Sequence, residues 1–132
     1  MILGVGTDLV EVGRLERAVA RLGEEFLREI LTAAEIGRFR RSSRFLPACA
    51  AAFAAKEALF KALGTGRTGR LSWHDLEFSD PWRVPRLHLQ GATAEQAASG
   101  GALRAHVSIA ATRRHASAVV VLEGSRPGAE RD

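Results

Sequence analysis

The spacing of apolar and polar residues at the start of the chain predicts a strand followed by a helix. Residues 2–7 are mostly apolar, and Gly4 and Gly6 stand at alternate positions, a spacing that indicates close approach of another group to the strand. From Glu11 the apolar residues recur with a helical period, and Gly23 is well placed to end that helix. The apolar stripe consists of Val12, Leu15, Val19 and Leu22.

Three further helices are predicted in the first half of the chain. A short one covers residues 24–31, and Thr32 and Glu35 have the spacing of a capping box that opens the next. The third is long and rich in alanine, runs to Leu63 and ends at Gly64. Its small side chains require a neighbouring element to pack close against it.

In the second half of the chain the pattern changes to that of strands, with one short helix at 92–99. The predicted strands are 71–78, 87–90, 103–109 and 116–122. We therefore expect one α+β domain over residues 1–123, with a long central helix packed on an antiparallel sheet. Residues 124–132 are polar and contain Gly and Pro, which predicts a flexible tail.

The composition narrows the class of protein. The chain has 132 residues, 46% hydrophobic and 26% charged, with a single Cys, which excludes wholesale disorder and a disulfide scaffold. Its net charge of +4 favours an anionic partner: nucleic acid, membrane, nucleotide or acidic protein. Aromatic residues make up only 6%, which argues against a base-stacking nucleic-acid surface. No apolar run reaches the roughly 18 residues of a membrane helix, and residues 1–6 do not resemble a signal peptide. We expect a cytoplasmic protein that binds neither nucleic acid nor membrane.

Two carboxylates are candidates for chemistry. Asp8 follows the first predicted strand, where it either caps the next helix or binds a hard cation, and capping is the more common role. Glu57 and Lys61 are four residues apart on the long helix, a spacing that most often indicates a surface salt bridge. Glu57 nevertheless lies among Ala and Phe residues, where a carboxylate usually has a specific partner.

Two polar segments later in the chain have an ordinary and a functional interpretation. Gly64 and Gly66 either end the long helix with a turn or let backbone N–H groups approach a phosphate. They follow the C-terminus of a helix, so they lack the favourable dipole of a phosphate loop. His106 and Ser108 share one face of a predicted strand and form either a structural polar patch or a ligand site.

Three arginines lie on the side of the first helix opposite its apolar stripe, at Arg14, Arg17 and Arg21. Such a basic face is usually a solvated helix surface. Its functional alternative is a docking surface for an acidic helix.

Several segments match, in order, the motifs of one known family. The chain opens with GVGTDLVEVGRL at 4–15 and carries the more specific FAAKEALFKALGTG at 53–66. WHDLE at 73–77, HVSI at 106–109 and the last strand at 116–122 complete the match. In these motifs the chain resembles the bacterial holo-acyl-carrier-protein synthases, the small, trimeric type of 4′-phosphopantetheinyl transferase.

The resemblance implies a reaction and roles for the candidate residues. The phosphopantetheine arm of coenzyme A is moved to a serine of an apo acyl carrier protein, and adenosine 3′,5′-bisphosphate is released. Asp8, Glu57 and Lys61 are the implied catalytic residues: the two carboxylates bind Mg²⁺ and the lysine lies against the diphosphate. Either Glu57 or a metal-bound water assists deprotonation of the serine.

The resemblance also implies binding surfaces in a homotrimer with active sites between subunits. Arg14 and Arg21 are expected to dock the acidic helix of the carrier protein. The residues implied in coenzyme A binding, besides the lysine, are Gly64, Gly66, His106 and Ser108, the last two from a neighbouring subunit.

The chain departs from the family pattern in the nucleotide pocket. Ala52 replaces an Arg before the FAAKEA motif, so coenzyme A affinity is expected to be weaker unless Arg44 or another Arg substitutes. Arg83 stands where the family often has Gly, and Ala110 and Ala111 stand where many members have a further polar residue and a His. These departures favour the alternative of a non-catalytic homologue that binds the carrier protein but has impaired coenzyme A binding. The intact pair of metal-binding carboxylates opposes it.

Overall fold

The computed structural model describes residues 1–64 and 71–126, and it confirms an α+β fold. Its strands are β1 (Ile2–Glu11), β2 (Leu76–Phe78), β3 (Leu87–Leu89), β4 (Ala102–Ala111) and β5 (His115–Gly124). Its α-helices are α1 (Val12–Leu22), α2 (Glu24–Ile30), α3 (Ala33–Arg40), α4 (Phe45–Ala62) and α5 (Gly91–Ser99), and one 3₁₀ turn covers Trp73–Asp75.

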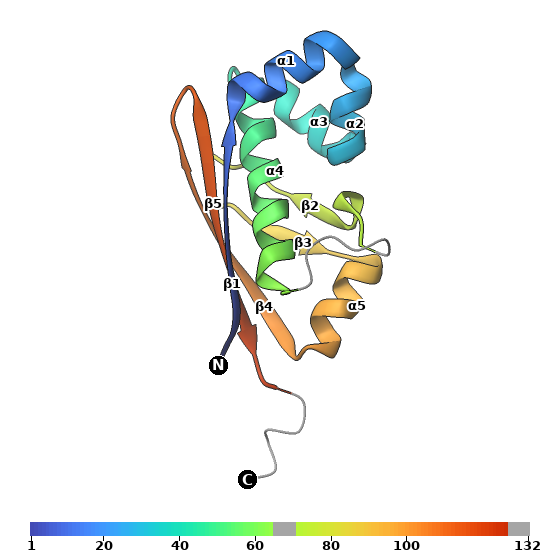
Figure 1. Cartoon of the computed structure of the whole chain (residues 1–132), viewed down its shortest axis with the longest axis vertical. Helices are drawn as coiled ribbons and strands as arrows, with labels where there is room; N and C mark the ends of the chain where they lie inside the picture. Colours follow the sequence, from blue (N-terminus) through green and yellow to red (C-terminus); the bar gives the residue numbers. More distant parts are fainter. Residues whose placement is uncertain (65–70, 127–132) are drawn as a thin grey trace.

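A three-stranded antiparallel sheet forms one layer of the molecule, with the strand order β1-β5-β4. The long helix α4 lies along one face of this sheet, and the other helices and the β2–β3 hairpin are on the same side (Figure 1). No described element covers the opposite face, which leaves Val5 55%, Leu9 66% and Val119 38% exposed.

Helix α4 is buried on almost all sides because most of its side chains are methyl groups. Residues 48–52 have no exposed surface, and neither have Ala54, Ala55 and Ala58. Such small side chains let the sheet pack against one side of α4, and α1 and α3 against others. The long alanine-rich helix predicted from the sequence is therefore confirmed, together with the close packing that it requires.

Strand β1 lies directly on the backbone of α4, which explains the two alternate glycines. A Cβ atom on Gly6 would overlap the carbonyl oxygen of Ala58 and lie 2.7 Å from the amide nitrogen of Ala62. A Cβ atom on Gly4 would likewise overlap the carbonyl oxygen of Ala62. The predicted close approach to this strand is confirmed, and the approaching group is the main chain of α4.

Two predicted strands have different bounds in the structure. The first continues past residue 7 because its pairing with β5 continues as far as Glu11, opposite His115. The strand predicted at 71–78 is confined to β2, because Ser72 Oγ accepts a hydrogen bond from His74 N (3.1 Å) at a turn. These changes shorten the hairpin with β3 and lengthen the sheet under α4.

The ends of β1 and β5 are joined, which moves the start of the predicted tail. The amino group of Met1 donates to the carbonyl oxygen of Gly124 (2.8 Å), and Gly124 N donates to Met1 O (2.9 Å). Gly124 therefore belongs to the sheet, whereas residues 127–132 lie outside the described part of the chain. Among the described helices, none combines the length and the apolar character of a membrane span.

Candidate active site

Asp8 lies within β1, on the face of the sheet that carries α4. Its neighbours across the sheet are Ala118 and Ile109, and its side chain is 17% exposed. The capping interpretation is wrong, because β1 runs on to Glu11 and no side chain caps α1. The continued pairing with β5 places the carboxylate beside a helix rather than at the start of one.

Glu57 and Lys61 lie on the accessible stripe of α4. Between residues 48 and 62, only Phe53, Glu57 and Lys61 are not buried, and they follow one another at helical spacing. The Lys61 ammonium donates to Asp8 Oδ1 (2.9 Å) and to the carbonyl oxygen of Thr7 (3.0 Å). The structure thus joins the predicted catalytic residues of β1 and α4 through an ion pair.

The donor set of this site is suited to Mg²⁺. Asp8 would offer a hard carboxylate oxygen from β1, and the half-buried Glu57, one helical turn before Lys61, would offer another from α4. The described residues contain no group of three or more His, Cys, Asp or Glu able to hold a metal ion. Mg²⁺ is commonly held by one or two carboxylates, substrate phosphates and water, so a site with two carboxylates fits that ion.

The C-terminal end of α4 confirms one predicted helix boundary. Gly64 follows the last helical residues with φ of +81°, a left-handed conformation that favours glycine. It is exposed and lies one turn beyond Lys61. Gly66, the second glycine predicted to contact coenzyme A, lies outside the described residues.

His106 and Ser108 lie on the uncovered face of the sheet. They pair with Val121 and Val119 of β5, whose side chains point away from α4. His106 Nε2 is 2.9 Å from Glu123 Oε1, and this hydrogen bond lowers the pKa of Glu123. Within one chain, these two residues are on the opposite side of the sheet from Asp8.

Two of the three arginines on α1 are available to a partner. Arg14, Arg17 and Arg21 are all exposed, as predicted. Arg17 is paired with Glu11 (3.1 Å). Arg14 and Arg21 have no ion-pair partner among residues 1–64 and 71–126.

The structure does not place Arg44 where it can substitute for the arginine missing at Ala52. Arg44 is the N-cap of α4 and stands eight positions before Ala52, about 12 Å away along the helix axis. The Arg44 guanidinium instead stacks on the ring of Trp82 at 5.1 Å. Ala52 itself has no exposed surface.

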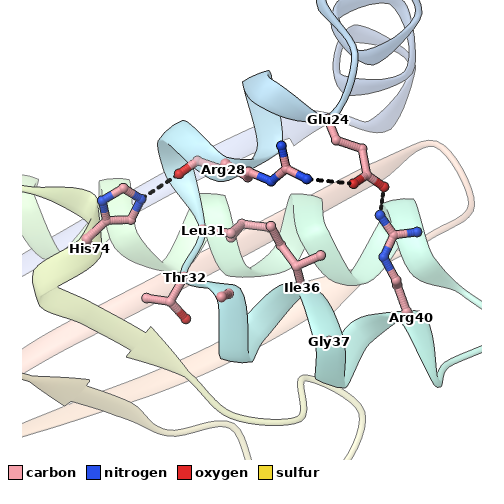
Figure 2. Close-up of a pocket in the computed structure, with 9 residues that line it drawn as sticks. Glu24, Arg28, Leu31, Thr32, Ile36, Gly37, Arg40 and His74 are labelled. Atoms are coloured by element: carbon pink, nitrogen blue, oxygen red, sulfur yellow. Dashed lines mark hydrogen bonds and ion pairs between the residues drawn. The ribbon is translucent and has the colours of Figure 1, made fainter.

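A hollow of about 640 Å³ lies between α2 and α3, away from the predicted site (Figure 2). Leu31 and Ile36 contribute apolar side chains, and on its rim Arg28 and Arg40 both pair with Glu24. The charges on the rim are thus largely neutralised within the chain. No residue of the predicted site lines this hollow.

The most deeply buried charged pair among the described residues lies outside the site predicted from the sequence. Lys56 and Glu35 have no exposed surface, and Lys56 Nζ donates to Glu35 Oε1 (2.6 Å). Burial lowers the pKa of Lys56, and the Glu35 carboxylate opposes that change. The sequence signal for this pair is a lysine surrounded on its helix by alanines and aromatic residues, whereas the residues around Glu35 indicate only a capping box.

Comparisons with known proteins identify the family. A profile of the 4′-phosphopantetheinyl transferase superfamily matches residues 4–120. The holo-[acyl-carrier-protein] synthase of Koribacter versatilis is 43% identical over 124 residues, 93% of this chain and 99% of that protein. That of Solidesulfovibrio magneticus is 47% identical over 125 residues, 94% and 100% of the two chains.

Solved structures show the same fold. The holo-[acyl-carrier-protein] synthase of Neisseria meningitidis matches with a TM-score of 0.85 and 32% identity, covering 93% of this chain and 99% of that one. The Helicobacter pylori synthase, solved in complex with coenzyme A, matches with a TM-score of 0.77 and 30% identity, covering 90% and 99%. The chain therefore belongs to the 4′-phosphopantetheinyl transferase superfamily and is an enzyme of the holo-[acyl-carrier-protein] synthase type.

Proposed function

We propose that Asp8, Glu57 and Lys61 are the residues with which this enzyme transfers the 4′-phosphopantetheine group of coenzyme A to a serine of an apo acyl carrier protein. The observation that carries this assignment is the ion pair between Lys61 and Asp8, which joins the exposed stripe of α4 to β1. The glycine contacts between β1 and α4 support it, because they bring the two elements together at the backbone.

In this proposal the serine oxygen attacks the β-phosphorus of coenzyme A. A new P–O bond forms to the serine, the bond from that phosphorus to the bridging oxygen breaks, and adenosine 3′,5′-bisphosphate leaves. Glu57, half-buried on α4, is the group of this chain that we assign to accept the serine proton. Mg²⁺, held by Asp8 and Glu57, would supply neutralising charge for the diphosphate and the leaving group.

Lys61 is the cation that this chain contributes to the diphosphate. The Lys61 side chain is 56% exposed although its ammonium contacts Asp8 and the Thr7 carbonyl, so it is accessible to an entering phosphate. A lysine acts there as a compact point charge with rotatable donors. Gly64, one turn further along and exposed, is assigned with Gly66 to the same ligand.

We assign the uncovered face of the sheet to contact between chains in a homotrimer. Its apolar residues Val5, Leu9 and Val119 form an exposed patch of the kind that usually marks an interaction surface. His106 and Ser108 lie on this same face, so they reach coenzyme A bound at the Asp8 site of a neighbouring chain rather than their own.

The apo carrier protein is assigned to α1, through Arg14 and Arg21. Their lack of ion-pair partners among the described residues leaves both charges available to an acidic helix. The cytoplasmic location predicted from the sequence stays part of the proposal. The names of the relatives favour the enzyme over the non-catalytic carrier-binding alternative.

The test is incubation with apo acyl carrier protein, coenzyme A and Mg²⁺, followed by the intact mass of the carrier. We expect the wild type to add phosphopantetheine and Glu57→Gln to add none while retaining its circular dichroism spectrum, because the substitution removes a charge at nearly constant volume. Glu29→Gln, at an exposed glutamate on α2, is the matched control and should behave as the wild type. Wild-type turnover by Glu57→Gln would refute the assignment of Glu57.

A further inference from the structure

We propose that the buried pair of Lys56 and Glu35 is a positioning device, which sets the rotation of α4 so that Glu57 and Lys61 face Asp8. The proposal rests on the function assigned above to those three residues. Lys56 directly precedes Glu57 on α4, and successive residues of an α-helix are about 100° apart around its axis. Whatever holds Lys56 in place therefore also sets the direction of Glu57.

Lys56 is anchored to elements outside its own helix. Its ammonium donates to Glu35 Oε1 (2.6 Å) and to the carbonyl oxygen of Ile30 (3.0 Å), at the end of α2. The side chain has no exposed surface, so water does not compete for either bond. Two acceptors from α2 and α3 thus hold one point on α4.

Glu35 is in turn held by three donors. Oε1 accepts from the backbone of Thr32 (2.8 Å) as well as from Lys56, and Oε2 accepts from the backbone of Phe78 in β2 (2.6 Å). The carboxylate therefore joins the start of α3, the strand β2 and the helix α4. Because both of its oxygens are bound, the carboxylate has little freedom to move.

The opposite side of α4 is fixed by contact with the sheet. The glycines of β1 admit no additional atom between β1 and α4, so the distance between them is set by backbone contact. Backbone contact alone leaves the helix free to rotate slightly about its axis. The anchor on the far side, at Lys56, removes that freedom, and α4 is held from both faces (Figure 1).

A contribution to stability is a weak explanation for this arrangement. A buried ion pair loses hydration, and apolar residues of similar volume are often as stabilising or more so. Directed hydrogen bonds add a defined orientation, whereas apolar contacts at a row of alanines allow small rotations. Displacement of a catalytic group by about 1 Å can reduce the rate by about 100-fold, so a small rotation of α4 is sufficient to matter.

The experiment compares the wild type with the double variant Lys56→Met/Glu35→Gln. The single variant Lys56→Met leaves a buried carboxylate without its cation and is expected to fold poorly, whereas the double variant has neutral side chains of nearly the same size. Two quantities are measured: the affinity for Mn²⁺ in the presence of coenzyme A, by electron paramagnetic resonance, and kcat and KM of transfer. We expect Mn²⁺ affinity and kcat to fall by 10- to 100-fold, with KM for the carrier protein changed less than twofold.

Arg38→Met is the matched control, because Arg38 Nη1 donates to the carbonyl oxygen of Phe78 (2.6 Å) and so ties α3 to β2, and among the described residues it has no hydrogen bond or ion pair to α4. It should reduce the melting temperature and leave Mn²⁺ affinity unchanged. Wild-type Mn²⁺ affinity and kcat in the double variant would overturn the proposal, as would an equal loss in Arg38→Met. A double variant that does not fold would assign the pair to stability and overturn it too. A wild type that transfers nothing would instead refute the proposed function.

Discussion

Substitution of Gly6 by alanine tests whether β1 and α4 are in contact at the backbone. The added Cβ atom would overlap the carbonyl oxygen of Ala58 and lie 2.7 Å from the amide nitrogen of Ala62. Both neighbours are main-chain atoms of a buried helix, so no side chain can move aside, and the strand and the helix must separate. Overpacking of this kind typically costs about 1–3 kcal/mol, and here we expect the upper part of that range. At this chain length that corresponds to a fall in Tm of roughly 6–10 °C.

The assay is equilibrium urea unfolding followed by tryptophan fluorescence, at one protein concentration for all variants because assembly changes apparent stability. Gly37→Ala is the matched control. Gly37 lies inside α3, and a Cβ atom added to it meets no atom within 4 Å, so helix propensity should raise the free energy of unfolding by up to about 1 kcal/mol. We also expect Gly6→Ala to lose most of its transfer activity, because Asp8 moves relative to α4. If Gly6→Ala were as stable as the wild type, the backbone contact between β1 and α4 would be refuted.

Three further predictions concern docking, assembly and pH. Arg14→Ala should raise KM for the apo carrier protein about two- to fivefold and leave KM for coenzyme A unchanged. The control is Arg17→Ala, which should change neither KM because Arg17 is already paired with Glu11. Equal effects of the two substitutions in steady-state kinetics would contradict the docking role. Val119→Asp places a charge at the centre of the uncovered sheet face, which we assign to contact between chains. The variant should have the mass of a single chain by light scattering and an unaltered circular dichroism spectrum. A variant with the mass of a trimer would count against contact through this face. Burial raises the pKa of the Cys49 thiol from about 9 to about 12, so the unfolded chain loses this proton first. Stability should therefore fall above pH 9, by up to about 1.4 kcal/mol per pH unit, and Cys49→Ala should show a flatter profile in urea unfolding.

The helices were predictable because their signals are local. The capping box at Thr32 and Glu35 forms as expected, with Glu35 N donating to Thr32 Oγ1 (3.1 Å). On α1 the predicted stripe buries Val12 and Leu15 and half-buries Val19, whereas Leu22 at the end of the helix is 53% exposed. The glycine after α4 likewise marks a boundary that a few neighbouring residues determine. The glycines of β1 correctly indicated a close neighbour, although the sequence could not identify it.

Features that depend on residues distant in the sequence could not be predicted in the same way. The local pattern around Asp8 favours a helix cap over a cation ligand, because the extension of β1 is determined by β5, more than a hundred residues away. Glu35 was assigned to its local partner, since nothing near it in the sequence indicates Lys56 or Phe78. His106 and Asp8 lie on opposite faces of the sheet, which is determined by the register in which β1 and β4 pair with β5. The alternation of residues within one strand does not reveal that register.

The order of strands in the sheet has a consequence for how the enzyme is made. β5 occupies the centre of the sheet, between β1 and β4, yet it is the last of them in the sequence. Asp8 pairs with Ala118, so the contact that places it joins residues more than a hundred positions apart in the chain. Contacts between residues so far apart in the sequence form slowly, because a long loop of the chain must be closed before the two residues can meet. A nascent chain on the ribosome can form its early helices, but Asp8 takes its position beside Lys61 only after β5 has emerged, so we expect no transfer activity from an incomplete chain.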